Sequence, residues 1–155
     1  MKFTKGYWMN LPGVTNTDAV QVREVKVEND RVYLYTVPYH ADMRAMGGPL
    51  LEMYISSPQP DIIRTEAYHF MGSNQKMPAF ELNDAHCALE VENTETTVTI
   101  KSGNTKLVIG KNPCSFDYYY KDKKLTSIGN RFGNAMISTI STPDGNHMRA
   151  QMNLD

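Results

Sequence analysis

The sequence has no excess of charge of either sign. Its 155 residues include 16 Lys and Arg against 17 Asp and Glu, which gives a formal net charge of −1. Charges of both signs are scattered along the chain, whereas proteins that bind nucleic acid carry a basic stripe or patch. We therefore expect no nucleic-acid partner.

Long apolar runs are also missing. The longest are a handful of residues, far short of the roughly 20 that a helix needs to span a bilayer. Lys2 and Lys5 stand near the amino terminus without an apolar stretch behind them, so the sequence predicts no secretory signal. We expect no membrane partner.

Cysteine is scarce. Cys87 and Cys114 are the only two, and neither has a second cysteine or a histidine at the spacing of a zinc site. The histidines are equally dispersed, and they are His40, His69, His86 and His147. We therefore expect no metal and no cofactor, and two reduced thiols in a cytoplasmic protein.

Amphipathic helices are absent from the pattern, because no segment of ten or more residues combines the helical apolar period with capping residues. Short segments rich in Val, Tyr and Thr alternate apolar with polar residues, and Gly, Pro, Asn and Asp separate them. We expect a hairpin over 20–37 and further strands over 50–56, 63–69, 136–140 and 148–154. This pattern predicts an all-β fold, an antiparallel β-sandwich formed as a single domain by residues 1–155.

Residues 96–127 carry the clearest strand pattern. Three short strands follow one another there, and two turns join them. Gly103 can take a positive φ without a steric clash in the first turn. Pro113 has no amide hydrogen to donate to a ladder, so it ends the second strand. The polar segment 121–124 makes the next turn, and the whole stretch predicts a β-meander.

Three stretches of the sequence carry motifs that follow one another in a characteristic order. The opening, MKFTKGYWMNLPGVT, contains Gly-x-Trp followed by Pro-Gly. Residues 48–70, GPLLEMYISSPQPDIIRTEAYHF, give a strand, a Ser-Pro-x-Pro-Asp turn and an Ile-Arg strand. Residues 96–127 add a Ser-Gly turn, an Asn-Pro break, an aromatic strand and an Asp-Lys turn. Together they resemble the amino-terminal domain of glycoside hydrolase family 31, and the opening is most similar to the α-xylosidase branch.

The resemblance implies a galactose-mutarotase-like β-sandwich that precedes a catalytic (β/α)8 barrel in a retaining α-glycosidase. Such enzymes use two aspartates about 5 Å apart, and in this family one of them lies in a Trp-x-Asp-Met-Asn-Glu-type motif on a barrel strand. Here the only tryptophan, Trp8, is followed by Met9-Asn10 and has no such motif. A barrel alone needs about 250 residues, and this chain ends at Asp155 inside what reads as a strand.

We therefore expect a non-catalytic amino-terminal domain of a longer α-xylosidase or α-glucosidase, inactive alone and packed against the barrel of the same parent chain. In the family a loop of this domain helps to shape the sugar site. The nearest candidate in this chain is segment 143–149, in which Asp144, Asn146 and His147 would lie near an α-glycoside or oligosaccharide. A solvent-exposed turn is the interpretation that we favour for this segment over a place at the sugar site.

A free-standing carbohydrate-binding module is a second hypothesis. Such a module stacks sugars on exposed aromatic rings, and the candidates are Trp8, Tyr33, Tyr35 and Tyr119. The three tyrosines would face outward on their strands, where they could equally pack under a neighbouring domain.

A free-standing enzyme of the mutarotase type is a third hypothesis. It would use a histidine acid and a glutamate base, and His69 with Glu66 and His86 with Glu81 stand close in sequence. Such enzymes have about twice this length, so we expect structural or solvated roles for these residues.

A domain separated from a larger enzyme exposes its former interface. Such interfaces commonly cover about 600–1,500 Å², and the chain has ten methionines and nine tyrosines, two residue types that adapt well to contacts. We therefore expect clustered apolar groups on one exposed face, in part from the carboxy-terminal half, and weak self-association.

Overall fold

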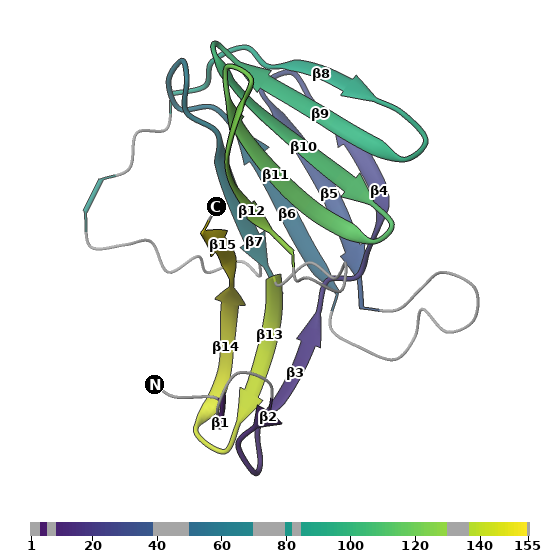
Figure 1. Ribbon diagram of the computed structural model, residues 1–155, viewed down its shortest axis with the longest axis vertical. Coiled ribbons are helices and arrows are strands. Elements are labelled where there is room, and N and C mark those ends of the chain that lie inside the picture. The colour runs from purple at the N-terminus through teal and green to yellow at the C-terminus, as the bar shows by residue number, and fades with distance from the viewer. Residues whose placement is uncertain are drawn as a thin grey trace.

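The computed structural model of the chain describes residues 4–5, 9–38, 50–69, 80–81, 85–129 and 137–154. These residues form fifteen β-strands and no helix, which confirms the predicted all-β fold. Two sheets pack face to face, and a third extends from one end of the pair (Figure 1). Within the described ranges no helix is long and apolar enough to cross a membrane.

The larger sheet contains the predicted meander. Its strand order is β15-β12-β11-β10-β9-β8. The strands are β8 Glu90–Asn93, β9 Thr97–Ser102, β10 Thr105–Lys111, β11 Cys114–Tyr120, β12 Lys123–Ile128 and β15 Met152–Leu154. Three two-residue turns join β9 to β12, and Gly103 in the first has a φ of 57°. The second contains a cis peptide bond before Pro113. The third is shorter than predicted, because β12 already begins at Lys123.

The smaller sheet of the pair has the order β4-β5-β6-β7. Its strands are β4 Gln21–Val27, β5 Arg31–Val37, β6 Leu51–Ser56 and β7 Arg64–Tyr68. The predicted hairpin over 20–37 is the β4-β5 pair, and the predicted strands 50–56 and 63–69 are β6 and β7. A β-bulge interrupts the register between Val22 and Glu24.

The hydrophobic core lies between these two sheets. Alternate side chains of each strand point to one face, and the inward ones form a single buried cluster. Its fully buried members are Val32, Leu34, Met53, Ile55, Val98, Ile100, Leu107, Ile109, Cys114 and Phe116. The shared core confirms the predicted β-sandwich, and Phe116 of β11 is its largest fully buried side chain.

Hydrogen bonds connect the turn at 57–61 to the turn between β9 and β10. Asp61, which has a φ of 68°, accepts a hydrogen bond from the amide N–H of Asn104. The hydroxyl of Thr105 donates to the backbone oxygen of Asp61 at 2.6 Å. A Cβ atom added at Gly103 would clash with the Asp61 carboxylate. The two sheets are therefore joined by polar contacts at this end as well as by the core.

A third sheet extends from the opposite end of the sandwich (Figure 1). It has the order β14-β13-β3, and a small pair, β1-β2, lies beside its far end. The strands are β1 Thr4–Lys5, β2 Met9–Asn10, β3 Thr15–Asp18, β13 Ile137–Thr142 and β14 Gly145–Ala150.

The predicted single strand over 148–154 is wrong. The segment is interrupted at Gln151, so that β14 pairs with β13 in the three-stranded sheet whereas β15 pairs with β12 in the six-stranded sheet. Both halves alternate in the same way and no glycine or proline separates them, so the change of sheet has no local signal.

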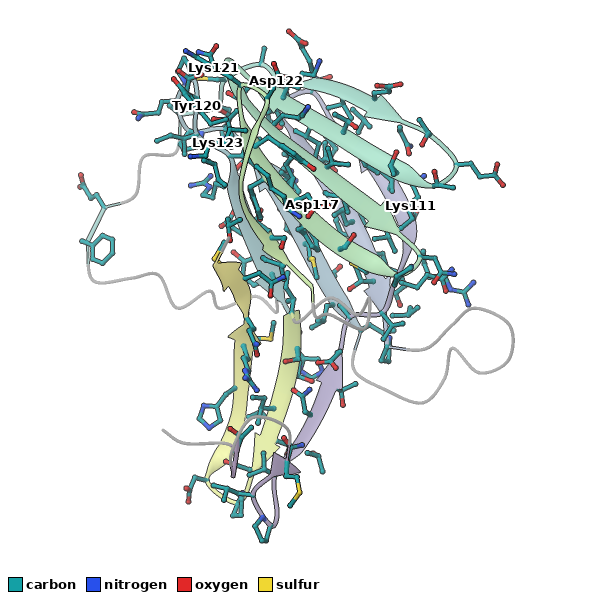
Figure 2. All side chains as sticks on the ribbon, viewed as in Figure 1. Lys111, Asp117, Tyr120, Lys121, Asp122 and Lys123 are labelled. Carbon is teal, nitrogen blue, oxygen red and sulfur yellow. The ribbon has the colours of Figure 1, made fainter. Side chains whose placement is uncertain are left out.

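Exposed apolar side chains are spread over several elements. They are Met9, Val27, Ile62, Phe80, Tyr120, Leu125, Met148 and Met152. Tyr120 lies with Lys121, Asp122 and Lys123 at the end of the sandwich remote from the three-stranded sheet (Figure 2). Met148 lies on β14, at the other end. The contiguous apolar face stays a prediction.

The two thiols differ sharply in environment. Cys114 is fully buried, and its burial raises the pKa of the thiol to about 12, whereas Cys87 is half-buried. Because the thiolate is the reactive form, we expect only Cys87 to react promptly with Ellman's reagent in the folded chain. Both thiols should react in denaturant without reductant.

A Cys87→Ser variant is the control for this titration. It should show no prompt phase while folded and one reactive thiol when unfolded. Equal rates at the two cysteines in the folded chain would contradict the buried position of Cys114.

Candidate functional site

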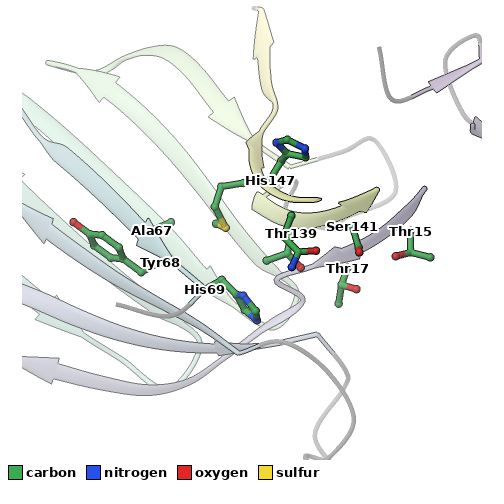
Figure 3. A pocket seen from close by; sticks show the side chains of 10 residues that line it. Thr15, Thr17, Ala67, Tyr68, His69, Thr139, Ser141 and His147 are labelled. Atoms are coloured by element: carbon green, nitrogen blue, oxygen red, sulfur yellow. The ribbon is translucent and has the colours of Figure 1, made fainter. Parts of the chain in front are cut away.

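A hollow of about 700 Å³ lies where the three-stranded sheet meets the end of β7 (Figure 3). Its lining residues are Thr15, Thr17, Ala67, Tyr68, His69, Thr139, Ser141, Asn146, His147 and Met148. Small-molecule sites in proteins commonly measure about 300–1,000 Å³. The hollow therefore has the size of a small-molecule site.

The strand register explains why the floor of the hollow is rich in hydroxyl groups. Residues directly opposite one another in a sheet project to the same face. Thr17, Thr139 and Met148 stand opposite one another across the three strands. Thr15, Ser141 and Asn146 form the next such row. One face of the sheet thus presents four hydroxyl groups and a side-chain amide.

The wall of the hollow comes from the end of β7, with Ala67, Tyr68 and His69 (Figure 3). The Tyr68 hydroxyl donates to Oε1 of Glu66 at 3.1 Å. Burial raises the pKa of Tyr68, and the neighbouring Glu66 carboxylate raises it further. The phenol is therefore neutral at physiological pH, and its hydrogen bond fixes the orientation of the ring.

The structure brings two of the three predicted loop residues to this hollow. Asn146 and His147 line it, and Asn146 shares the face of Thr15 and Ser141. His147 stands opposite Ile140 in the register, so it contributes from the edge of the site. Asp144 lies in the β13-β14 turn, where its amide N–H donates to the hydroxyl of Thr142 at 3.2 Å. Their proximity to substrate stays a prediction.

The opposite face of the same sheet holds a half-buried carboxylate. Asp18 accepts a hydrogen bond from Nδ2 of Asn16 at 2.7 Å. Burial raises the pKa of Asp18, and the opposing effects of Asn16, Arg149 and Ser138 are smaller. A carboxyl group with a raised pKa binds its proton more tightly in the folded chain than in the unfolded chain. The stability of the fold therefore falls as the pH rises through the pKa of the folded state.

We expect an Asp18→Asn variant to have a higher thermal unfolding midpoint than the wild type at pH 7. The gain should shrink as the pH falls toward the ordinary pKa of an aspartate, because the wild-type carboxyl is then protonated as well. Melting curves at pH 4 and pH 7 measure this, with Asp144→Asn as the exposed control. A lower midpoint for Asp18→Asn at pH 7 would mean that attraction to Arg149 outweighs burial.

A row of tyrosines on the outer face of the four-stranded sheet leads to the rim of the hollow. The ring centroids of Tyr33 and Tyr54 are 5.3 Å apart, and those of Tyr54 and Tyr68 are 6.1 Å apart. The sequence analysis selected Tyr33 but missed Tyr54 and Tyr68. Their places on β6 and β7 become adjacent to Tyr33 only through strand pairing, although their outward phase in each alternating strand was a usable signal.

Cations cover two of the predicted stacking rings. Nζ of Lys26 lies 5.2 Å from the ring centroid of Tyr33, and Nζ of Lys106 lies 4.8 Å from that of Tyr119. A sugar that stacks on these faces would have to displace a lysine. Tyr35 is half-buried on the same outward phase as Tyr33. Trp8 lies outside the described residues.

Two of the four residues considered for autonomous acid–base catalysis, Glu66 and His86, have other polar contacts. Glu66 accepts from Tyr68 and lies 3.5 Å from Nε of Arg64. Nδ1 of His86 lies 3.5 Å from a carboxylate oxygen of Asp30. Among the described residues, no group of three or more His, Cys, Asp or Glu side chains could hold a metal ion.

Comparison with known proteins places the fold within much larger chains. No known family profile matches the sequence. The cycloalternan-forming enzyme of Listeria monocytogenes, solved in complex with a pentasaccharide substrate, matches with a TM-score of 0.61 at 19% identity. The match covers 85% of this chain and 11% of that enzyme.

A second match is an uncharacterized protein from Listeria monocytogenes EGD-e, also with a TM-score of 0.61 at 19% identity. It covers 85% of this chain and 11% of that protein. A structure of the same protein with α-D-glucose, β-D-glucose, magnesium and calcium matches at 17% identity over 88% of this chain, with the same TM-score of 0.61. That match also spans 11% of the larger protein. This chain thus has the fold of a small part of these proteins.

Proposed function

We propose that this chain is a non-catalytic amino-terminal domain of a larger α-glycosidase. In this proposal the sandwich, of the galactose-mutarotase-like kind, packs against a catalytic (β/α)8 barrel of the same parent chain and helps to shape its sugar site. In this proposal the parent enzyme is a retaining hydrolase of glycoside hydrolase family 31. An α-xylosidase is our first choice for its activity, and an α-glucosidase is the second.

One observation carries this proposal above the others. The fold match covers 85% of this chain and only 11% of the cycloalternan-forming enzyme, so this fold occurs as a minor part of an enzyme that acts on an oligosaccharide. The motifs of the opening, of 48–70 and of 96–127 support the same assignment, and no nucleophile motif follows the single tryptophan.

A free-standing carbohydrate-binding module is the second candidate. The hydroxyl-lined hollow favours it, because a binding module needs a sugar site of its own and no catalytic partner. The two candidates differ in what lies downstream: the first requires a barrel encoded in the same reading frame beyond Asp155.

The experiment is therefore to sequence the gene beyond the codon for Asp155, and to express the 155-residue chain, the downstream region and the full product separately. We expect the full product to hydrolyse aryl α-xylosides or α-glucosides and the 155-residue chain to show no turnover. The separated parts should associate in size-exclusion chromatography.

The outcomes separate the candidates. A stop codon directly after Asp155, or a downstream region that is not a barrel, would overturn the glycosidase-domain proposal. Turnover by the isolated chain would overturn it as well, provided that substitution of one of its own carboxylates abolishes the activity.

A further inference from the structure

The hollow between β7 and the three-stranded sheet is lined mostly by uncharged side chains, many of which carry a hydroxyl group. Apart from two histidines, its lining residues are threonines, a serine, an asparagine, a tyrosine, an alanine and a methionine. None of these carries a charge at neutral pH. The lining has no Asp, Glu, Lys or Arg side chain, so a charged ligand would lose hydration there with at most an imidazole as its partner, which is costly. The lining therefore favours a neutral ligand.

The hydroxyl groups on the floor are available to such a ligand. No hydrogen bond between side chains of the described residues engages the hydroxyls of Thr15, Thr17 or Thr139. Each hydroxyl can both donate and accept, and the amide of Asn146 adds donors and an acceptor. A ligand with several hydroxyl groups of its own matches this floor, since each of its groups must also donate and accept.

Apolar surface borders the same floor. Met148 stands beside Thr139 in the register, and Ala67 forms part of the wall. A pyranose has the same two-sided character, with C–H groups on its faces and hydroxyls around its rim.

We propose that this hollow binds a neutral saccharide, whose hydroxyl groups are held by Thr17, Thr139 and Asn146 and whose C–H surface contacts Ala67 and Met148. The volume of about 700 Å³ is large enough for a short oligosaccharide. The proposal rests on the proposed function only in choosing a saccharide among neutral polyhydroxylated ligands.

The test is a titration of the 155-residue chain with maltotriose, followed by backbone amide shifts in ¹H–¹⁵N spectra. We expect saturable shifts at Thr17, Thr139 and Asn146, with weak binding of about millimolar strength. A Thr139→Val variant, which keeps the shape and removes one hydroxyl, should weaken binding about fivefold. Thr99→Val is the matched control, because Thr99 is a half-buried threonine at the centre of β9, remote from the hollow.

Two further ligands test the chemical class. Glucose 6-phosphate should bind more weakly than maltotriose, because the lining offers its phosphate no lysine or arginine. myo-Inositol carries its hydroxyls on one six-membered ring, so it fills less of the hollow. It should therefore also bind more weakly than the longer maltotriose. Tighter binding of either ligand, shifts confined to the tyrosine row, or an unchanged affinity in Thr139→Val would each overturn the proposal.

This test can fail independently of the proposed function. If the separated barrel and sandwich associate but maltotriose produces no saturable shift, the saccharide site is wrong and the domain assignment stands. If maltotriose binds but no barrel is encoded downstream, the domain assignment is wrong and the saccharide site stands. If Thr139→Val weakens association with the barrel and no saccharide binds, the hollow is a packing surface.

Discussion

Replacing Phe116 by alanine is expected to lower the free energy of unfolding by about 3–5 kcal/mol. Phe116 is fully buried between the two sheets and is the largest side chain in that position. Its removal leaves a cavity that the strands on either side, β10 and β12, can fill only in part. Because whole domains are stable by about 5–15 kcal/mol, the variant should be partly unfolded near physiological temperature. Urea titration followed by far-ultraviolet circular dichroism measures the change.

Tyr120→Ala is the matched control for this substitution. Tyr120 lies on the same strand but is 40% exposed, so its truncation should cost about 1 kcal/mol or less. Similar losses at the two positions would mean that the centre of the core does not lie at Phe116.

Replacing Gly103 by alanine is expected to cost at least about 2 kcal/mol of stability. Gly103 has a φ of 57°, which disfavours a side chain, and its added Cβ would clash with the Asp61 carboxylate. That carboxylate cannot retreat freely, since the amide N–H of Asn104 donates to it. The added Cβ should therefore push apart the turn at 57–61 and the turn between β9 and β10, which the hydrogen bond from Asn104 to Asp61 joins.

A double-variant cycle with Asp61→Gly isolates the clash from the backbone strain. Glycine suits the φ of 68° at position 61 and removes the carboxylate. We expect Gly103→Ala to cost about 1 kcal/mol less in the Asp61→Gly background than in the wild type. Strict additivity of the two unfolding free energies, measured in urea, would contradict the contact between the turns.

The parts of the fold that the sequence predicts well are those set by neighbouring residues. The meander over 96–127 and the hairpin over 20–37 depend on alternation and on local turns such as Gly103, and both are present. The division at Gln151 could not be predicted, because β14 and β15 have the same alternation and differ only in which distant strand they meet, β13 or β12.

The same distinction applies to the candidate site. Asn146 and His147 were selected by resemblance, and they line the hollow. Thr17 and Thr139 were not selected, because a threonine in a strand fits the alternating pattern without marking a function. They become one surface only when β3 pairs with β13, and the hollow appears only when that sheet meets β7.

The pairing of β3 with β13 also has a consequence for the order in which the chain acquires its structure during synthesis. Thr17 leaves the ribosome well before its strand partner Thr139, because the whole sandwich lies between them in the sequence. The strands β4 to β12 can pack into a sandwich as soon as Ile128 is free. The hollow can be completed only after Ala150 has followed, so a nascent chain halted before that residue has the strands of the sandwich and an incomplete hollow.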